Sequence, residues 1–259
     1  MCPPYKSPRD RAKRVATHEP LAASVIGVNY DWEQPAAGVY RCRLPFLDVT
    51  VGLVQGDRGV LLIDCGTTLA EARGIAEDVR GLTGTEVTYL VMTHHHFDHI
   101  LGSGGFPGAQ TYAAAPVAAA LSTDIEAVRA QALSYGANPD DLDRAIAAAC
   151  APDHVIENAE IDLGDRIVRV ENPGRGHTDH DLIVVVPTPG SGPVVFCGDL
   201  IEESADPAID EGSDASAWPQ TLNRVLAVGG EDARYVPGHG AIVDAAFVRR
   251  QRDWLAQRS

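Results

Sequence analysis

One segment constrains this chain more than any other: Thr93-His94-His95-His96-Phe97-Asp98-His99. It directly follows the apolar run Val87–Met92, whose composition predicts a buried strand. On an extended strand end, residues two apart point the same way, so His94 and His96 can meet on one metal ion. His95 points the other way and is not expected to be a ligand. The chain must therefore fold so that a strand end presents a metal site.

More ligands are needed than this segment supplies. Asp98 and His99 lie past the turn, where they can face a second ion, and imidazole beside carboxylate suits zinc and other divalent metals. Because four ligands cannot complete two sites, we expect others at further strand-to-loop junctions. Three such junctions carry a single ligand-type residue next to glycine, which allows tight turns: His177, Asp199 and His239.

The remaining pattern predicts a layered α/β domain, because strands and helices recur in two similar halves. Runs of β-forming residues predict strands at Val39–Leu44, Val49–Gln55, Val60–Asp64, Val87–Met92, Ala109–Ala113, Ile167–Glu171, Asp181–Pro187, Pro193–Cys197 and Arg234–Val236. Helical spacing of apolar residues predicts helices at Leu69–Leu82, Pro116–Ser134, Asp140–Cys150, Trp218–Val228 and Ala245–Gln257.

Length and the N-terminal residues set the expected domain organisation. The 259 residues suit one large domain, which we assign to residues 21–259. Residues 1–20 are polar and basic, with no apolar run behind the charges, and are expected to form a flexible arm instead of a secretory signal. No stretch approaches the ~20 apolar residues of a membrane span. These features, with five cysteines that form no disulfide framework, predict a cytoplasmic protein.

The net charge of the chain limits the classes of molecule that it is expected to bind. The formal net charge is −15, from 36 acidic and 21 basic residues. Nucleic acid and anionic membranes bind through clustered cations, so both are disfavoured, and a small-molecule substrate is expected. The stretch Glu202–Asp214 carries six acidic residues without a basic one. Its default interpretation is a solvated loop, and the alternative is a loop that overhangs the metals and repels anions. His180 is interpreted as a solvated loop residue, with pocket lining as the alternative, and Tyr30 and Trp32 as pocket aromatics.

The motif set from about Val49 to about Val243 resembles the metallo-β-lactamase fold superfamily, which includes β-lactamases, glyoxalase II-like thioesterases and lactonases. The resemblance implies an αββα sandwich of two mixed β-sheets flanked by helices. It implies that His94, His96 and His177 hold one metal, that Asp98, His99 and His239 hold the second, and that Asp199 bridges them. Asp64, in the run Val60–Gly66, would support the site without touching a metal.

The resemblance also implies a chemistry. Two Zn²⁺ ions per chain, with Mn²⁺ or Fe²⁺ as possible replacements, would share a bridging hydroxide that attacks the carbonyl of an ester, thioester, lactone or amide. Asp98 and Asp199 are the catalytic candidates, as groups that orient this hydroxide. A true β-lactamase is disfavoured because Asp199 stands where those enzymes often have Cys, and Glu202 and Glu203 stand near the position of a substrate-binding Lys. Two competing functions are a mononuclear iron oxygenase of the persulfide dioxygenase type and a non-catalytic metal-binding protein.

Overall fold

Two mixed β-sheets lie face to face in the computed structural model, which describes residues 23–26 and 29–258. The first sheet contains, in spatial order, β1 (Ala23–Ile26), β2 (Asp31–Ala36), β3 (Val39–Arg43), β4 (Thr50–Gln55), β5 (Val60–Ile63), β6 (Tyr89–Val91), β7 (Gln110–Ala113) and β8 (His154–Val155). The second contains β13 (Arg234–Val236), β12 (Val194–Phe196), β11 (Ile183–Val186), β10 (Ile167–Glu171) and β9 (Asn158–Asp162). Strands β5 to β8 pair in parallel, as do β12 and β13, and the other pairs are antiparallel.

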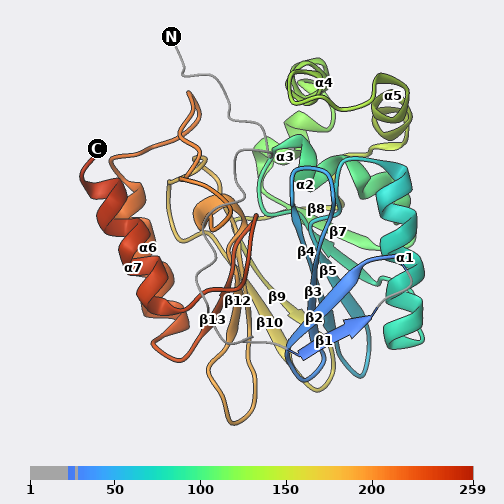
Figure 1. Cartoon of the computed structure of the whole chain (residues 1–259). Coiled ribbons are helices and arrows are strands. Elements are labelled where there is room, and N and C mark those ends of the chain that lie inside the picture. The colour runs from blue at the N-terminus through green and yellow to red at the C-terminus, as the bar shows by residue number, and fades with distance from the viewer. Residues whose placement is uncertain (1–22, 27–28, 259) are drawn as a thin grey trace.

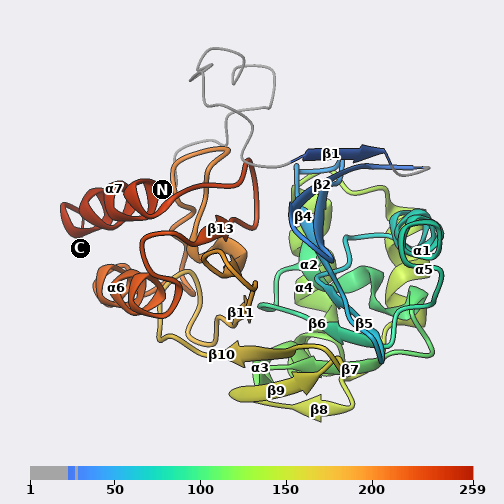
Figure 2. The same cartoon turned by 90° about the horizontal axis from the view of Figure 1, so that it is seen from below.

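Helices cover the outer face of each sheet, so the layers read helix, sheet, sheet, helix (Figures 1 and 2). On the side of the first sheet lie α1 (Leu69–Thr83), α2 (Phe97–Ile100), the 3-10 turn η2 (Leu101–Gly105), α3 (Ala115–Ala120), α4 (Ile125–Ser134) and α5 (Pro139–Ala148). On the side of the second lie α6 (Trp218–Gly229) and α7 (Ala245–Ala256), and the turn η3 (Gly198–Leu200) follows β12. The predicted αββα sandwich is confirmed.

Alternation along the strands produces these layers. On β5, Leu62 belongs to the core shared with the helices, whereas Leu61 and Ile63 belong to the core between the sheets. Neighbouring side chains of a strand point to opposite faces, so a strand buried on both faces must be apolar at every position. Gly52 on β4 is required here, because a Cβ at this position would overlap the ring of Phe196 from the opposite sheet.

Two sequence predictions differ from the structure. The helix expected over residues 116–134 is two helices, α3 and α4, which separate at Leu121–Asp124. In this break the Ser122 hydroxyl donates to Ala118 O at 2.6 Å, so it competes with the backbone amides for helical carbonyls. Strands β1, β2, β8 and β9 are missing from the sequence prediction, because β2 and β9 are largely polar and β1 and β8 are only four and two residues long. The predicted arm at 1–20 lies outside the described residues. None of the helices in the described part of the chain combines the length and apolar character that a membrane crossing requires.

Candidate metal centre

The seven predicted ligands come together because the strands before them end at the same edge of the sandwich. Strands β5 and β6 pair in parallel with Ile63 opposite Val91, so Asp64 and the histidine segment emerge side by side. Strands β12 and β13 pair in parallel with Phe196 opposite Val236, which brings the Asp199 and His239 loops together. The amide of Gly238 donates to Gly198 O at 2.8 Å and ties these two loops to each other.

The first group of candidate ligands contains His94, His96, His177 and Asp199, whose ligand atoms all lie within 4.8 Å of one another. His96 Nδ1 faces His94 Nε2 at 3.1 Å and His177 Nε2 at 2.9 Å. Asp199 Oδ2 lies 3.7 Å from His94 Nε2 and 3.5 Å from His177 Nε2. Three imidazole nitrogens and a carboxylate oxygen therefore converge on one point.

The second group contains Asp98, His99 and His239, again within 4.8 Å. His239 Nε2 lies 3.5 Å from Asp98 Oδ2, and His99 Nε2 lies 3.4 Å from His239 Nε2. Asp199 also reaches this group, with Oδ1 at 3.1 Å from His99 Nε2 and Oδ2 at 3.4 Å from His239 Nε2. Asp199 thus stands between the two groups and contacts both.

The second ring nitrogen of the histidines faces away from the cluster, in four of the five toward a hydrogen-bonding partner. His94 Nδ1 lies 3.0 Å from Thr93 Oγ1, and His99 Nδ1 lies 2.8 Å from Asp64 Oδ2. Two other histidines face backbone carbonyls. His177 Nδ1 lies 3.2 Å from Ala208 O, and His239 Nδ1 lies 2.9 Å from Leu47 O. An outward N–H that donates leaves the inward nitrogen with a free lone pair, which is the form that binds metal.

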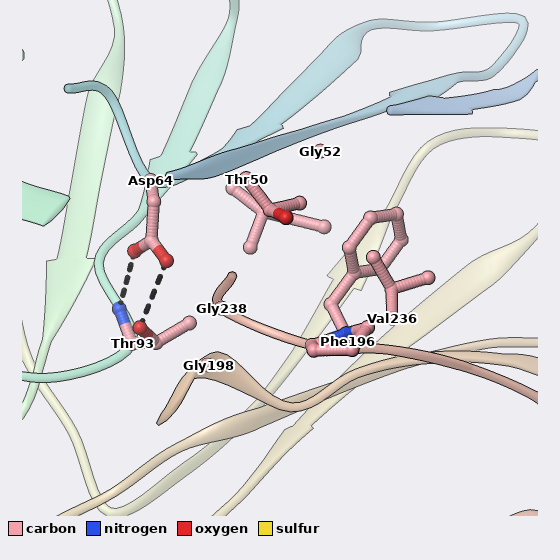
Figure 3. A pocket seen from close by; sticks show the side chains of 10 residues that line it. Thr50, Gly52, Asp64, Thr93, Phe196, Gly198, Val236 and Gly238 are labelled. Atoms are coloured by element: carbon pink, nitrogen blue, oxygen red, sulfur yellow. Dashed lines mark hydrogen bonds between the residues drawn. The ribbon is translucent and has the colours of Figure 1, made fainter. Parts of the chain in front are cut away.

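Asp64 contacts candidate ligands of both groups, His99 directly and His94 through Thr93. Its carboxylate accepts from Thr93 N at 2.8 Å and from the Thr93 hydroxyl at 2.9 Å (Figure 3), in addition to its contact with His99. Through Thr93 it also reaches His94. Asp64 has a left-handed backbone, with φ of 58°, which is uncommon for a residue other than glycine and is tolerated by Asp and Asn. The left-handed turn at position 64 places the carboxylate next to Thr93 N and His99 Nδ1.

Burial and nearby carboxylates shift the pKa values of the histidines in opposite directions. Burial, with the neighbouring imidazoles, lowers the pKa of His94 and of His96 well below the usual value, so both rings are neutral. For His239, burial acts in the same direction, but Asp199 and Asp98 outweigh it and raise the pKa to about 10. The carboxylates that raise this pKa would equally attract a metal cation, which displaces the proton on binding.

An unpartnered carboxylate oxygen of Asp199 also indicates that the residues of the centre fit a metal ion. Asp199 Oδ1 is buried and has no hydrogen-bond partner of acceptable geometry, although His99 Nε2 is near. A buried carboxylate oxygen without a partner is costly unless a cation meets it. Glycine makes room for this carboxylate, because a Cβ on Gly238 would overlap Asp199 Oδ1. Imidazole and carboxylate donors in these numbers are the ligands of zinc and similar divalent ions.

A cavity of about 10 Å³ lies behind the centre, where Asp64, Thr93 and Gly238 meet Thr50 and Phe196 (Figure 3). Such a volume holds about one water molecule. It is too small for an organic molecule.

Several residues lie differently from their sequence interpretation. His180 is buried, with 6% of its surface exposed, and its Nε2 lies 3.1 Å from His95 Nδ1, so the solvated-loop interpretation is wrong. His95 belongs to neither group of candidate ligands. The acidic stretch reaches the centre through the Ala208 carbonyl and through Asp210, whose Oδ2 lies 3.7 Å from His96 Nε2. Sequence reasoning missed Ala208 and Leu47 because they act through backbone carbonyls, which every residue has.

Comparison with known protein families gives one match over most of the chain: the model described as the metallo-beta-lactamase superfamily covers residues 44–239. Among curated relatives, the human "Metallo-beta-lactamase domain-containing protein 1" is 31% identical over 193 residues, 73% of this chain and 60% of that protein. The chain thus spans about three fifths of this relative. "Metallo-beta-lactamase type 2" of Bacillus cereus is 24% identical over 79% of this chain and 72% of that protein.

Solved structures agree on the fold. The DIM-1 metallo-beta-lactamase superposes with a TM-score of 0.69 at 16% identity and covers 90% of this chain and 100% of its own. The FIM-1 enzyme from Pseudomonas aeruginosa, in its mono-zinc form, superposes with a TM-score of 0.64 at 20% identity, over 90% of this chain and 96% of its own.

Proposed function

The chain belongs to the metallo-β-lactamase superfamily of metal-dependent hydrolases, and from this premise we propose that it is a dinuclear zinc hydrolase. The substrates of this chain would be small molecules with a carbonyl ester, thioester, lactone or amide bond. The observation that carries the proposal is the position of Asp199, which contacts both groups of candidate ligands.

In this proposal each group holds one ion. His94, His96 and His177 would bind the first, Asp98, His99 and His239 would bind the second, and Asp199 would be shared. The inward nitrogens are set by outward partners, so the protein fixes ring orientation before a metal arrives. Such partners typically change metal affinity by about 10- to 100-fold when they are removed.

When bound, the two divalent ions supply Lewis acidity and lower the pKa of a coordinated water toward neutrality. The chain contributes acceptors beside that water: the carboxylates of Asp98 and Asp199, which we propose as the residues that orient it and accept its hydrogen bond. A thiol nucleophile is not needed. Burial raises the pKa of Cys65 and of Cys197, which keeps these neighbouring thiols protonated and unreactive.

The second group also bears on the possibility of a mononuclear iron oxygenase. An oxygenase with one iron requires only the first group, yet Asp98, His99 and His239 are buried and assembled with matching outward partners. A single ion in the first group would leave these three ligand-type side chains without a metal to bind. The geometry therefore favours two ions.

Elemental analysis of protein expressed without added metal tests the proposal. About two zinc ions per chain, with hydrolysis of a thioester, lactone or ester panel, is the expected result. About one iron per chain, with oxidation of thiols or persulfides and no hydrolysis, would overturn it.

A pair of neighbouring variants tests the ligand assignment. His96→Ala should lower zinc content and activity together, because His96 Nδ1 lies at the centre of the first group. His95→Ala is the matched control, since it removes an adjacent imidazole that points to His180 and not to the cluster. Equal zinc content in both variants would contradict the assignment.

A further inference from the structure

Solvent reaches the candidate metal centre from one side. Three ligands are almost completely enclosed, with His94 at 1%, His99 at 0% and His177 at 1% exposure. His96 and Asp199 retain 9% each and His239 retains 8%, so the mouth of the centre runs along these three residues. Any substrate must enter past them, and the groups beside them determine what enters.

Asp210 stands at the His96 end of this mouth. Its Oδ2 lies 3.7 Å from His96 Nε2, and 47% of its side chain is exposed, so the carboxylate faces both the ligand and the solvent. Its other oxygen is fixed in the loop, because Oδ1 accepts from Gly212 N at 2.8 Å. The charge therefore has a defined place at the entrance.

The loop that carries Asp210 is bonded to the segment that carries His177. The Ser213 hydroxyl donates to His177 O at 2.8 Å, and Asp214 N donates to Gly176 O at 2.9 Å. Asp210 N in turn donates to Ser213 Oγ at 3.1 Å. These bonds hold the acidic loop over the first group of ligands and explain why Asp210 does not project freely into water.

Among the described residues, no Lys or Arg forms an ion pair with Asp210. The only ion-pair contact of Asp210 there is with His96. Arg175, the basic residue of the facing segment, lies 3.4 Å from Asp214 instead. Both lysines of the sequence are at positions 6 and 13, before the described residues.

We propose that Asp210 is a specificity-determining residue that favours substrates with a cationic group, such as an ammonium, over anionic ones at this entrance. The inference rests on the proposed metal-dependent hydrolase and names its substrate class. The metal charge attracts every anion alike, so the effect of Asp210 is measured as the change, on substitution of residue 210, in the relative affinity of two ligands of the same shape, one cationic and one neutral. A carboxylate about 6 Å from a ligand charge, at the protein surface, changes relative affinity on the order of tenfold.

Binding of matched thiols to the zinc-loaded protein tests this without catalysis. The probes are thiocholine, which carries a trimethylammonium group, and its neutral carbon isostere 3,3-dimethylbutane-1-thiol, with Kd measured by calorimetry. Asp210→Asn keeps the acceptor for Gly212 N and removes the charge. We expect wild type to prefer the cation, and Asp210→Asn to lose about tenfold of that preference. Glu211→Gln, the matched control, makes the same change of charge on an exposed neighbour and should leave the preference unchanged.

The outcomes separate the two proposals. An unchanged ratio in Asp210→Asn, or an equal change in Glu211→Gln, would overturn the role of Asp210, because the first shows no charge effect and the second a diffuse one. The S-acetyl thioesters of thiocholine and of 3,3-dimethylbutane-1-thiol are then assayed as substrates. If neither is hydrolysed while thiol binding still depends on residue 210, the specificity inference holds and the hydrolase proposal loses support.

Discussion

Replacing Asp64 by Asn should weaken metal binding at both groups while the backbone stays intact. In the structure one carboxylate oxygen accepts from Thr93 N, and the other accepts from the Thr93 hydroxyl and faces His99 Nδ1. An amide has only one oxygen and so cannot serve both positions. Asn tolerates the left-handed backbone of position 64, where φ is 58°, so a backbone penalty does not confuse the result.

Both orientations of the new amide disturb the histidines. If its oxygen meets Thr93 N, its NH₂ faces His99 Nδ1, which must then accept, so the proton moves to the inward Nε2. The Thr93 hydroxyl is turned toward His94 Nδ1 with the same effect there. If the amide is reversed, its NH₂ opposes the N–H of Thr93. Two inward nitrogens lose their lone pairs in the first case, and a buried donor is left unpaired in the second.

The expected loss is about 10- to 100-fold in zinc affinity, which corresponds to about 1.4–2.7 kcal/mol, because outward partners of metal-bound histidines typically have that effect. Competition with a chromophoric chelator measures it. Asp78→Asn is the control: Asp78 is a buried carboxylate that accepts from Asn29 N, Tyr30 N and Trp32 Nε1, none of which belongs to a candidate metal ligand. Its loss should lower Tm and leave zinc affinity unchanged. Wild-type zinc affinity in Asp64→Asn would refute the orientation argument.

Three further results are expected. Gly238→Ala should displace Asp199 and lower the zinc stoichiometry, which metal analysis would show, whereas Gly108→Ala, at a site with open space, should not. Removal of metal by a chelator should lower Tm, because ions that bind only the folded state stabilise it, and restored zinc should reverse the change; an unchanged Tm would contradict metal binding by the folded chain. Leu62→Ala should reduce the free energy of unfolding by about 2–5 kcal/mol, because Leu62 is fully buried. Denaturant unfolding measures this change, and a smaller one would contradict the prediction.

Local pattern predicted much of the secondary structure. The strand at Ile167–Glu171 and the helix start at Leu69 match the structure, because each is a short apolar pattern with clear turn residues beside it. The prediction of one helix over residues 116–134 was wrong for a local reason too, because the hydroxyls of Ser122 and Thr123 donate to carbonyls of the preceding helix. The interpretation of Trp32 as a pocket aromatic is wrong as well, because Trp32 is fully buried and donates to Asp78. Tyr30 likewise packs against the helix-side core.

The sequence by itself determined the composition of the candidate centre. Metal ligation needs particular side chains, and these stand at strand ends beside glycines, so their identity is visible without a fold. The two groups of candidate ligands lie side by side because the strands before them pair, as the order of elements predicted.

Only the tertiary structure decided how each ring is oriented and where the centre opens. Leu47 and Ala208 contribute carbonyl oxygens, and a carbonyl carries no trace of its role in residue type. Asp210 is one of six acids in its stretch, and its place beside His96 depends on the path of the loop. That path is set by bonds to the segment of His177, more than thirty residues earlier in the chain, and such contacts exist only after the chain has folded.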